Sequence, residues 1–193
     1  MAIGELGSGL SAAEHHEDAL SVKEAELSMM RRLGDSESNI LTAQGNLANS
    51  YSVLGREEEA LRIRRDVYSG TLKLYGEEHR ESLVDAFNYA TSLVQLKRYE
   101  EAKSLLRESI SVARRVGRDD SEVSIRMRAL YAQALYKDPR ASLDGLREAV
   151  KTLEDTDRIA RRVFGGAHPL VLQVERALRD ARTLLRAREA PGS

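Results

Sequence analysis

The sequence NLANSYSVLGR at residues 46–56, followed by EEEA at 57–60, sets the architecture because most of it is repeated. After 42 residues the pattern returns as NYATSLVQLKRYEEA at 88–102, and LYA at 130–132 keeps the same register after another 42. Glycines that follow a large apolar residue mark the same period at positions 34, 76, 117 and 165, with spacings of 42, 41 and 48. Markers that share one phase over two periods indicate an internal repeat.

Each repeat reads as a pair of α-helices, which we call its A helix and its B helix. In the first full A helix, Leu41, Leu47, Ala48, Tyr51 and Leu54 fall on one face at helical spacing. A glycine ends each B helix, as is common where the chain turns into the left-handed conformation. We therefore expect an all-α fold with helices at about 15–33, 39–54, 57–75, 80–96, 99–116, 121–137, 142–164 and 169–188.

The composition excludes several classes of protein. The chain has 193 residues, 41% hydrophobic and 32% charged, and no cysteine, so a disulfide framework and a cysteine zinc site are excluded. The net charge of -1 argues against nucleic-acid binding, and arginine pairs that recur near the ends of B helices are typical of a solvated face. Because no run of about 18 apolar residues and no secretory signal is visible, we expect a soluble cytoplasmic protein.

The links between repeats carry a family resemblance. Residues 165–172 read GGAHPLVL, and residues 76–83 read GEEHRESL, so His168 and His79 occupy equivalent positions that we interpret as helix caps. Over residues 15–187 the chain resembles tetratricopeptide repeat (TPR) proteins, and more narrowly the 42-residue repeats of the kinesin light chain family. The resemblance implies a right-handed TPR-like α-solenoid of about eight antiparallel helices. The coiled-coil heptads that attach kinesin light chains to the motor are absent, so that function does not carry over.

The resemblance also predicts the domain organisation. We expect a flexible segment at 1–14, a solenoid at 15–188 and a frayed tail at 189–193. Within the solenoid we expect a partial repeat at 15–34, repeats at about 38–76, 80–117 and 121–165, and a capping helix at 169–188. The first helix lacks a partner on its outer side, where Leu20, Leu27, Met29 and Met30 are expected to be partly exposed. Either the first repeat is truncated, or this face docks another chain.

Residues that could carry catalysis are few. His15 and His16 point in different directions on a helix, and we interpret them as solvated. Asp119 and Asp120 could form an acid pair or a metal site, but Asp119 with Glu122 also fits a helix-start capping box, the interpretation we favour. Phosphate-loop, dinucleotide and serine-hydrolase motifs are all absent. We therefore predict no enzyme, no catalytic residue, no metal and no cofactor.

The concave surface is then the expected site. In TPR solenoids the A helices line an inner groove, and the resemblance implies a peptide-binding groove on the following residues: Thr42, Asn46, Asn49, Ser52, Val84, Phe87, Asn88, Thr91, Gln95, Arg126, Gln133, Tyr136 and Lys137. The amides of Asn46 and Asn88 either bind a peptide backbone or tie adjacent helices together. Arg126 and Lys137 favour a protein or peptide partner with an apolar anchor and an acidic flank.

We therefore predict a non-catalytic interaction module of the adaptor or scaffold type, without nucleic-acid or membrane partners. The first alternative is a structural element that assembles through its open ends, with self-association around Leu20, Leu27 and Met30. The second alternative is a metal-dependent enzyme that uses Asp119 and Asp120.

Overall fold

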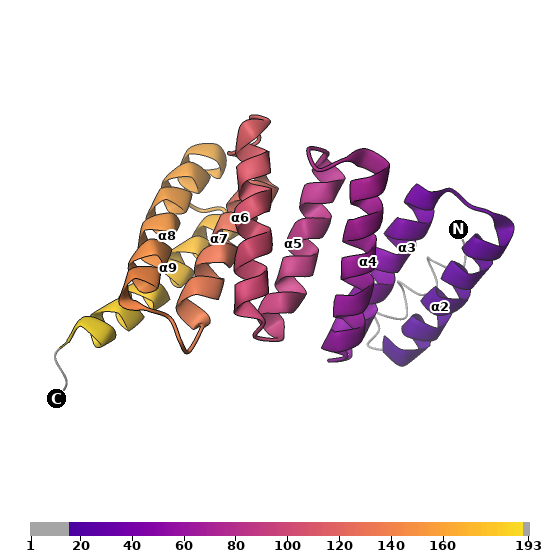
Figure 1. Ribbon diagram of the computed structural model, residues 1–193, viewed down its shortest axis with the longest axis horizontal. Helices are drawn as coiled ribbons and strands as arrows, with labels where there is room; N and C mark the ends of the chain where they lie inside the picture. The colour runs from indigo at the N-terminus through magenta and orange to yellow at the C-terminus, as the bar shows by residue number, and fades with distance from the viewer. Residues whose placement is uncertain (1–15, 191–193) are drawn as a thin grey trace. The chain divides into compact units, whose positions relative to one another are not determined.

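The computed structural model describes residues 16–190, and within that range all regular structure is α-helical, without a strand. Figure 1 shows the helices as successive antiparallel pairs joined by short turns. The expected segment 1–14 and all but two residues of the expected tail lie outside the described residues. The eight helices confirm the predicted fold class, with bounds within two residues of the expected ones: α2 (His16–Leu33), α3 (Glu37–Val53), α4 (Glu57–Tyr75), α5 (Arg80–Gln95), α6 (Tyr99–Arg115), α7 (Glu122–Lys137), α8 (Leu143–Phe164) and α9 (Pro169–Glu189).

The described chain forms two compact units, which we call the N-terminal unit, 16–96, and the C-terminal unit, 97–190. In the N-terminal unit α3 packs against both α2 and α4, and α4 packs against α5. In the C-terminal unit α7 packs against α6 and α8, while α9 contacts both α8 and α7. Within each unit every helix thus packs on its neighbours in sequence, which is the arrangement of helix-pair repeats.

The predicted histidine caps are confirmed. The Nδ1 atom of His79 accepts a hydrogen bond from the backbone N–H of Glu81 over 3.2 Å, and His168 caps α9 in the same way. The His79 ring also stacks on Tyr75, with ring centroids 4.5 Å apart, across Gly76 with φ 82°. The link motif therefore couples the end of one helix to the start of the next.

The predicted cap at Asp119 is wrong. Ser121 is the N-cap of α7, and its hydroxyl accepts from the backbone N–H of Ser124 over 3.3 Å. The Asp119 carboxylate instead pairs with Arg128 of α7, because a guanidinium is a stronger hydrogen-bond partner for a carboxylate than a single backbone N–H.

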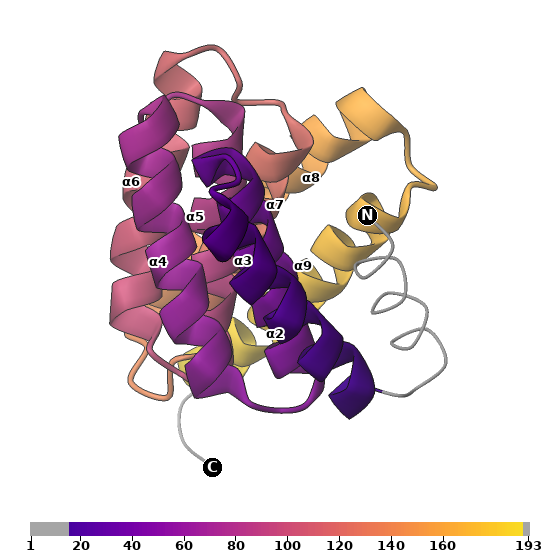
Figure 2. The same ribbon diagram turned by 90° about the vertical axis from the view of Figure 1, so that its right-hand side faces the viewer.

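The expectation that Leu20 and Leu27 are exposed is also wrong. Both side chains of α2 are buried, at 4% and 6% exposure, in a cluster with Leu47 of α3. Figure 2 views this end of the described chain and shows α2 lying against α3. The expectation holds for Met29, which is 40% exposed, and for Met30, which is half-buried; Leu33 at the end of α2 is 74% exposed. Leu20 and Leu27 therefore stabilise the fold and are unable to form a free docking surface.

Candidate functional site

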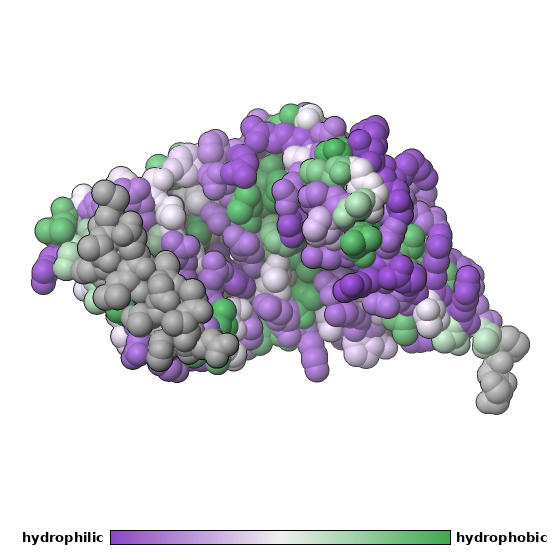
Figure 3. All heavy atoms as spheres, turned by 180° about the vertical axis from the view of Figure 1, so that it is seen from behind, coloured by the Kyte–Doolittle hydropathy of each residue, from purple (hydrophilic) through white to green (hydrophobic). Residues whose placement is uncertain are grey.

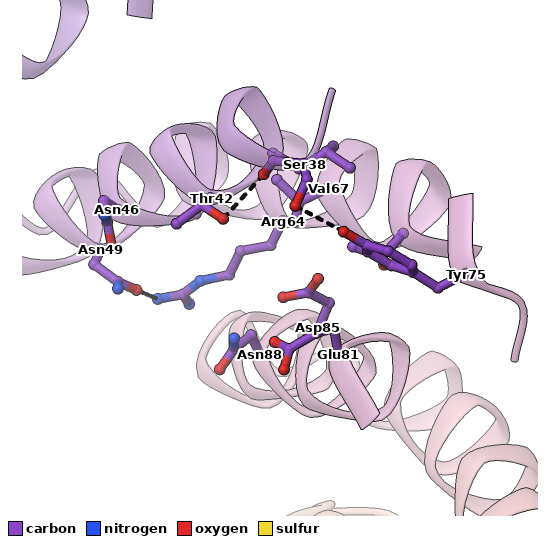
Figure 4. Close-up of a pocket in the computed structure, with 13 residues that line it drawn as sticks. Ser38, Thr42, Asn46, Asn49, Arg64, Val67, Tyr75, Glu81, Asp85 and Asn88 are labelled. Carbon is purple, nitrogen blue, oxygen red and sulfur yellow. Dashed lines mark hydrogen bonds between the residues drawn. The ribbon is translucent and has the colours of Figure 1, made fainter. Parts of the chain in front are cut away.

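A cavity of about 290 Å³ lies in the N-terminal unit between the A helices α3 and α5, with α4 behind it (Figure 4). Polar side chains make up most of its wall, and Leu41 and Val67 contribute an apolar part. A hydrogen bond from the Tyr75 hydroxyl to the Ser38 hydroxyl, 2.7 Å long, joins α4 to α3 at its edge. The lining residues are Ser38, Leu41, Thr42, Gly45, Asn46, Asn49, Arg64, Val67, Thr71, Tyr75, Glu81, Asp85 and Asn88.

Arg64 of α4 supplies the cation of the cavity. Its guanidinium donates to the Ser92 hydroxyl of α5 over 2.6 Å and to the side-chain oxygen of Asn49 of α3 over 3.0 Å. Burial lowers the pKa of Arg64, and the Glu57 carboxylate opposes this effect. Among the described residues the buried Nε–H of Arg64 has no hydrogen-bond partner. Arg64 thus ties three helices together while its charge is only partly compensated.

Asp85 of α5 supplies a carboxyl group to the same cavity. Burial raises the pKa of Asp85 to about 6, and the nearby Glu81 carboxylate adds to this rise. Hydrogen bonds from Thr71 and Asn88 lower the pKa and so partly offset the effect of burial. In Figure 4, Glu81, Asp85 and Asn88 project from α5 toward the space that the α3 side chains border. The cavity therefore offers donors and acceptors from both A helices.

Gly45 leaves room in the middle of α3. A Cβ atom added at Gly45 would meet no heavy atom within 4 Å, and the residue does not have a positive φ. Glycine in a helix interior costs about 1 kcal/mol relative to alanine. Neither a positive φ nor close packing requires a glycine at position 45. The missing side chain therefore leaves open space at the wall of the cavity.

The structure brings four of the predicted groove residues together in this cavity: Thr42, Asn46, Asn49 and Asn88. The other predicted residues of the N-terminal unit do not line it: Ser52, Val84, Phe87, Thr91 and Gln95. Among these, Ser52 donates its hydroxyl to the Glu57 carboxylate over 2.9 Å, and Thr91 bonds the Phe87 carbonyl over 2.8 Å. Asn49, for which no such role was predicted, links α3 to α4 through Arg64, whereas Asn88 bonds Asp85 of its own helix.

Sequence reasoning missed Arg64 and Asp85. Arg64 lies on a B helix, and one of a pair of adjacent arginines gives no sign that its side chain turns toward the A helices. Asp85 carried a weak signal, since it lies one residue from Val84 and three from Asn88 on a helix assigned to the groove. The missing information in both cases was the direction of the side chain.

The predicted residues of the C-terminal unit have different environments. Arg126 pairs with Glu122 one helical turn away, with N–O distances of 2.7 and 2.9 Å. Gln133 is half-buried and Lys137 is exposed. Tyr136 is buried at 7% exposure, and burial raises its pKa to about 12. Tyr136 thus presents little surface to a partner.

The residues considered for catalysis are dispersed. Asp119 pairs with Arg128, and the Asp120 carboxylate lies 3.9 Å from Arg162. His15 lies outside the described residues. Within residues 16–190, no three His, Asp or Glu side chains are grouped so that they could hold a metal ion. In the same range, no helix combines the length and apolar composition needed to cross a membrane.

Figure 3 shows hydrophilic residues spread over the face opposite to that of Figure 1, with apolar residues in small groups among them. The large apolar side chains that are exposed in the described chain are distributed over several helices, with only Leu74 and Tyr75 adjacent in sequence: Met29, Leu33, Val53, Leu74, Tyr75, Val163, Leu172 and Leu184. Single exposed apolar residues of this kind are normal for folded proteins.

Comparison with known proteins identifies the class. Residues 39–115 match the tetratricopeptide repeat family, and that range includes α5, all but the first two residues of α3, and every residue of the cavity lining except Ser38. The match places tetratricopeptide repeats in residues 39–115, and the sequential helix pairs of the described chain have the TPR-like arrangement. Such repeats are generally protein–protein interaction modules and typically non-catalytic. No curated protein sequence matches the chain.

Solved structures confirm the fold over the whole chain. One similar structure contains nearly identical TPR-like repeats ascribed to a kinesin light chain from Podosopora anserina. It superposes with a TM-score of 0.80 at 21% identity, and the alignment covers 97% of this chain and 87% of that one. A second structure of such repeats from the same organism gives 0.71 at 18% identity, with 98% and 96% covered. BtubC (BKLC) of P. vanneervenii gives 0.64 at 14%, with 99% and 81% covered. At these identities the likeness shows the fold alone.

Proposed function

We propose that the protein is a non-catalytic interaction module that binds a short peptide segment of a partner protein in the cavity between α3 and α5. The observation that carries this proposal is that four of the groove residues implied by the family resemblance line one cavity in the N-terminal unit. Cavities that bind ligands combine an apolar lining with a few placed polar groups, and this one has both.

The side chains suggest how the peptide is held. Leu41 and Val67 form an apolar wall on which a peptide side chain loses water-exposed surface. The amides of Asn46 and Asn88 each have a donor and an acceptor, so they can pair with the N–H and C=O groups of an extended backbone. The Nε–H of Arg64 has no acceptor among residues 16–190, which supports an acidic group beside the apolar anchor.

The proposal is tested by measuring peptide affinity in a variant that carries a larger side chain at the wall of the cavity. Peptides are first selected on the wild-type protein from a display library of random short peptides, and their affinities are then measured by fluorescence anisotropy. The Gly45→Leu variant places a side chain in the open space beside the cavity, so we expect its affinity for the selected peptides to fall at least about tenfold.

The control is Ser28→Leu, which places the same side chain at an exposed position of α2 in the same unit. This variant is expected to bind like the wild type. Circular dichroism checks that both variants retain their helices. Peptides that bind Gly45→Leu as tightly as the wild type would exclude the cavity as their site.

A second pair of variants separates the cavity from the wider groove predicted by sequence. Asn49→Ala removes a lining residue, whereas Phe87→Ala removes a predicted groove residue that does not line the cavity. We expect Asn49→Ala to weaken binding more than Phe87→Ala. The reverse order would move the site away from Arg64 and along α5.

A further inference from the structure

A second cavity, of about 330 Å³, lies within the C-terminal unit between the B helices α6 and α8, with α7 behind it. Three arginines line it: Arg107 and Arg114 of α6, and Arg128 of α7. Ser111 and Thr152 add hydroxyl groups to its wall. It shares no residue with the cavity between α3 and α5, and no sequence motif pointed to it.

Arg128 is the most unusual of these residues because its charge is buried. The residue is only 8% exposed, and one nitrogen of its guanidinium pairs with the Asp119 carboxylate. Its Nε–H is also buried and has no hydrogen-bond partner among the described residues. Burial lowers the pKa of Arg128, and repulsion from Arg114 lowers it further, while Asp155 opposes both. A buried donor without an acceptor costs free energy that an incoming acceptor recovers.

The two carboxylates on the wall are already engaged by other donors. Glu148 of α8 accepts a hydrogen bond from the Tyr131 hydroxyl over 2.7 Å, and that hydroxyl accepts from Arg107 over 3.0 Å. Asp155 accepts from Arg158 over 3.1 Å.

The donors of Arg114 are less completely used. Its Nε lies 3.8 Å from the Asp119 carboxylate, beyond hydrogen-bond distance, and its side chain is 68% exposed. Two arginines on the wall of this cavity thus have donors to spare: Arg128 has one without a partner among the described residues, and Arg114 has solvent-accessible ones.

We propose that this cavity binds a phosphoryl group on Arg114 and Arg128, where it competes with the Asp119 carboxylate that lies beside both guanidinium groups. A guanidinium presents parallel N–H groups that match the oxygens of phosphate, and such charge-assisted pairs are stronger than neutral hydrogen bonds. A phosphoryl group is favoured over a carboxylate because its three acceptor oxygens can accept from both guanidinium groups at once, whereas the Glu148 and Asp155 charges oppose any anion and a dianion most. The proposal is independent of peptide binding in the N-terminal unit.

Calorimetry of the full chain tests the proposal with three probes at one ionic strength. Inorganic phosphate represents the free ion, a glycine-flanked phosphoserine peptide represents a modified partner, and acetate represents a carboxylate. Binding of either phosphate probe with weaker binding of acetate supports the proposal, and the tighter of the two identifies the source. Binding of neither phosphate probe, or equal binding of acetate, overturns it.

Two variants distinguish the cavity from general attraction to positive charge. Arg114→Gln is expected to weaken phosphate binding about tenfold through loss of a charge-assisted pair. Arg65→Gln is the control, since Arg65 has a 61% exposed side chain in the N-terminal unit and pairs only with its neighbour Asp66. Equal weakening by both variants, or no effect of Arg114→Gln, contradicts the proposal.

An NMR measurement reads the buried donor directly. The Nε–H signal of Arg128 should move on addition of inorganic phosphate, because this donor gains its first acceptor. The Nε–H signal of Arg65 should stay in place in the same titration. A stationary Arg128 signal under conditions where calorimetry detects binding would place the phosphate elsewhere.

Discussion

The two units pair their helices in the same way but differ at one position of each B helix, four residues after a fully buried alanine. In the N-terminal unit this position is a cation that bonds a serine on the next A helix: Lys23 donates to the Ser50 hydroxyl over 2.7 Å, and Arg64 donates to that of Ser92 over 2.6 Å. In the C-terminal unit it is a leucine with no exposed surface. Each position lies four residues after a fully buried alanine on a B helix: Ala19 and Lys23, Ala60 and Arg64, Ala102 and Leu106, Ala149 and Leu153.

The buried alanine is therefore the constant feature of the helix pairing, whereas the residue four positions later varies. A small side chain lets the helices approach, and either a leucine or a long cation can then fill the next turn. The cation leaves polar groups and incompletely compensated charge beside the A helices, as Arg64 does at the α3–α5 cavity. The leucine gives a dry contact that is less able to take part in recognition.

The largest expected effect on the free energy of unfolding comes from removing a buried leucine at this position in the C-terminal unit. Leu153→Ala removes a side chain with 0% exposure, so we expect the free energy of unfolding to fall by about 3 kcal/mol through lost burial and a residual cavity. Urea denaturation followed by circular dichroism measures the change. A loss below about 1 kcal/mol would mean that the site collapses around the smaller residue.

Replacing the cation Arg64 should lower the free energy of unfolding less than Leu153→Ala does, and a second substitution at Ser92 should reverse most of the loss. Arg64→Ala leaves the Ser92 hydroxyl unpaired, and we expect a cost of about 1–2 kcal/mol. The double variant Arg64→Leu/Ser92→Ala copies the C-terminal unit, where Leu106 and Ala134 are both fully buried. It should recover most of the loss, since both hydrogen-bonding groups are removed together. A double variant less stable than Arg64→Ala would show that leucine does not fit this unit.

Asp85 gives the N-terminal unit a pH dependence. Its folded pKa, about 6, lies above the unfolded value, so its contribution to stability is complete below about pH 4 and is lost as the pH rises through 6. Asp85→Asn should therefore stabilise the protein at pH 7.5 by about 1 kcal/mol, after allowance for the partial exposure of the carboxyl group. Thermal melts of both proteins between pH 4 and 8 test this. Parallel pH profiles would contradict the raised pKa.

The smallest expected effect is at Gly45. Gly45→Ala should raise the free energy of unfolding by about 0.5–1 kcal/mol, because the helix gains propensity and the added methyl group meets no atom. Gly70→Ala is the matched contrast on α4, where an added Cβ would lie 2.5 Å from a methyl carbon of Leu41. Gly70→Ala should gain less or lose stability. Equal gains at both positions would show that Leu41 moves aside freely.

The helices and their links could be predicted from the sequence because those signals are local. Both histidine caps followed from their place in the repeated link. The burial of Leu27 was not predictable from its own helix, since it depends on how Leu47 of α3 meets it. The cap at Asp119 failed for a similar reason, because Arg128, nine residues away, offers a stronger partner.

The candidate site was predictable in part. Thr42, Asn46, Asn49 and Asn88 follow from their register on the A helices, and they do line one cavity. Arg64 and Asp85 give this cavity its charge, but whether a charged side chain points to solvent or to a neighbouring helix depends on tertiary packing. The register of the repeat thus predicted part of the cavity lining, whereas the charged residues of the cavity depend on tertiary packing.

The central claim is that the space between α3 and α5 receives a peptide, and side-chain amide NMR tests it most directly. On titration with a selected peptide, the NH₂ signals of Asn46, Asn49 and Asn88 should shift together in proportion to occupancy. The NH₂ signal of Gln95, on the same helix as Asn88 but outside the cavity, should stay in place. Saturable peptide binding that leaves the three asparagine signals unmoved would contradict the account.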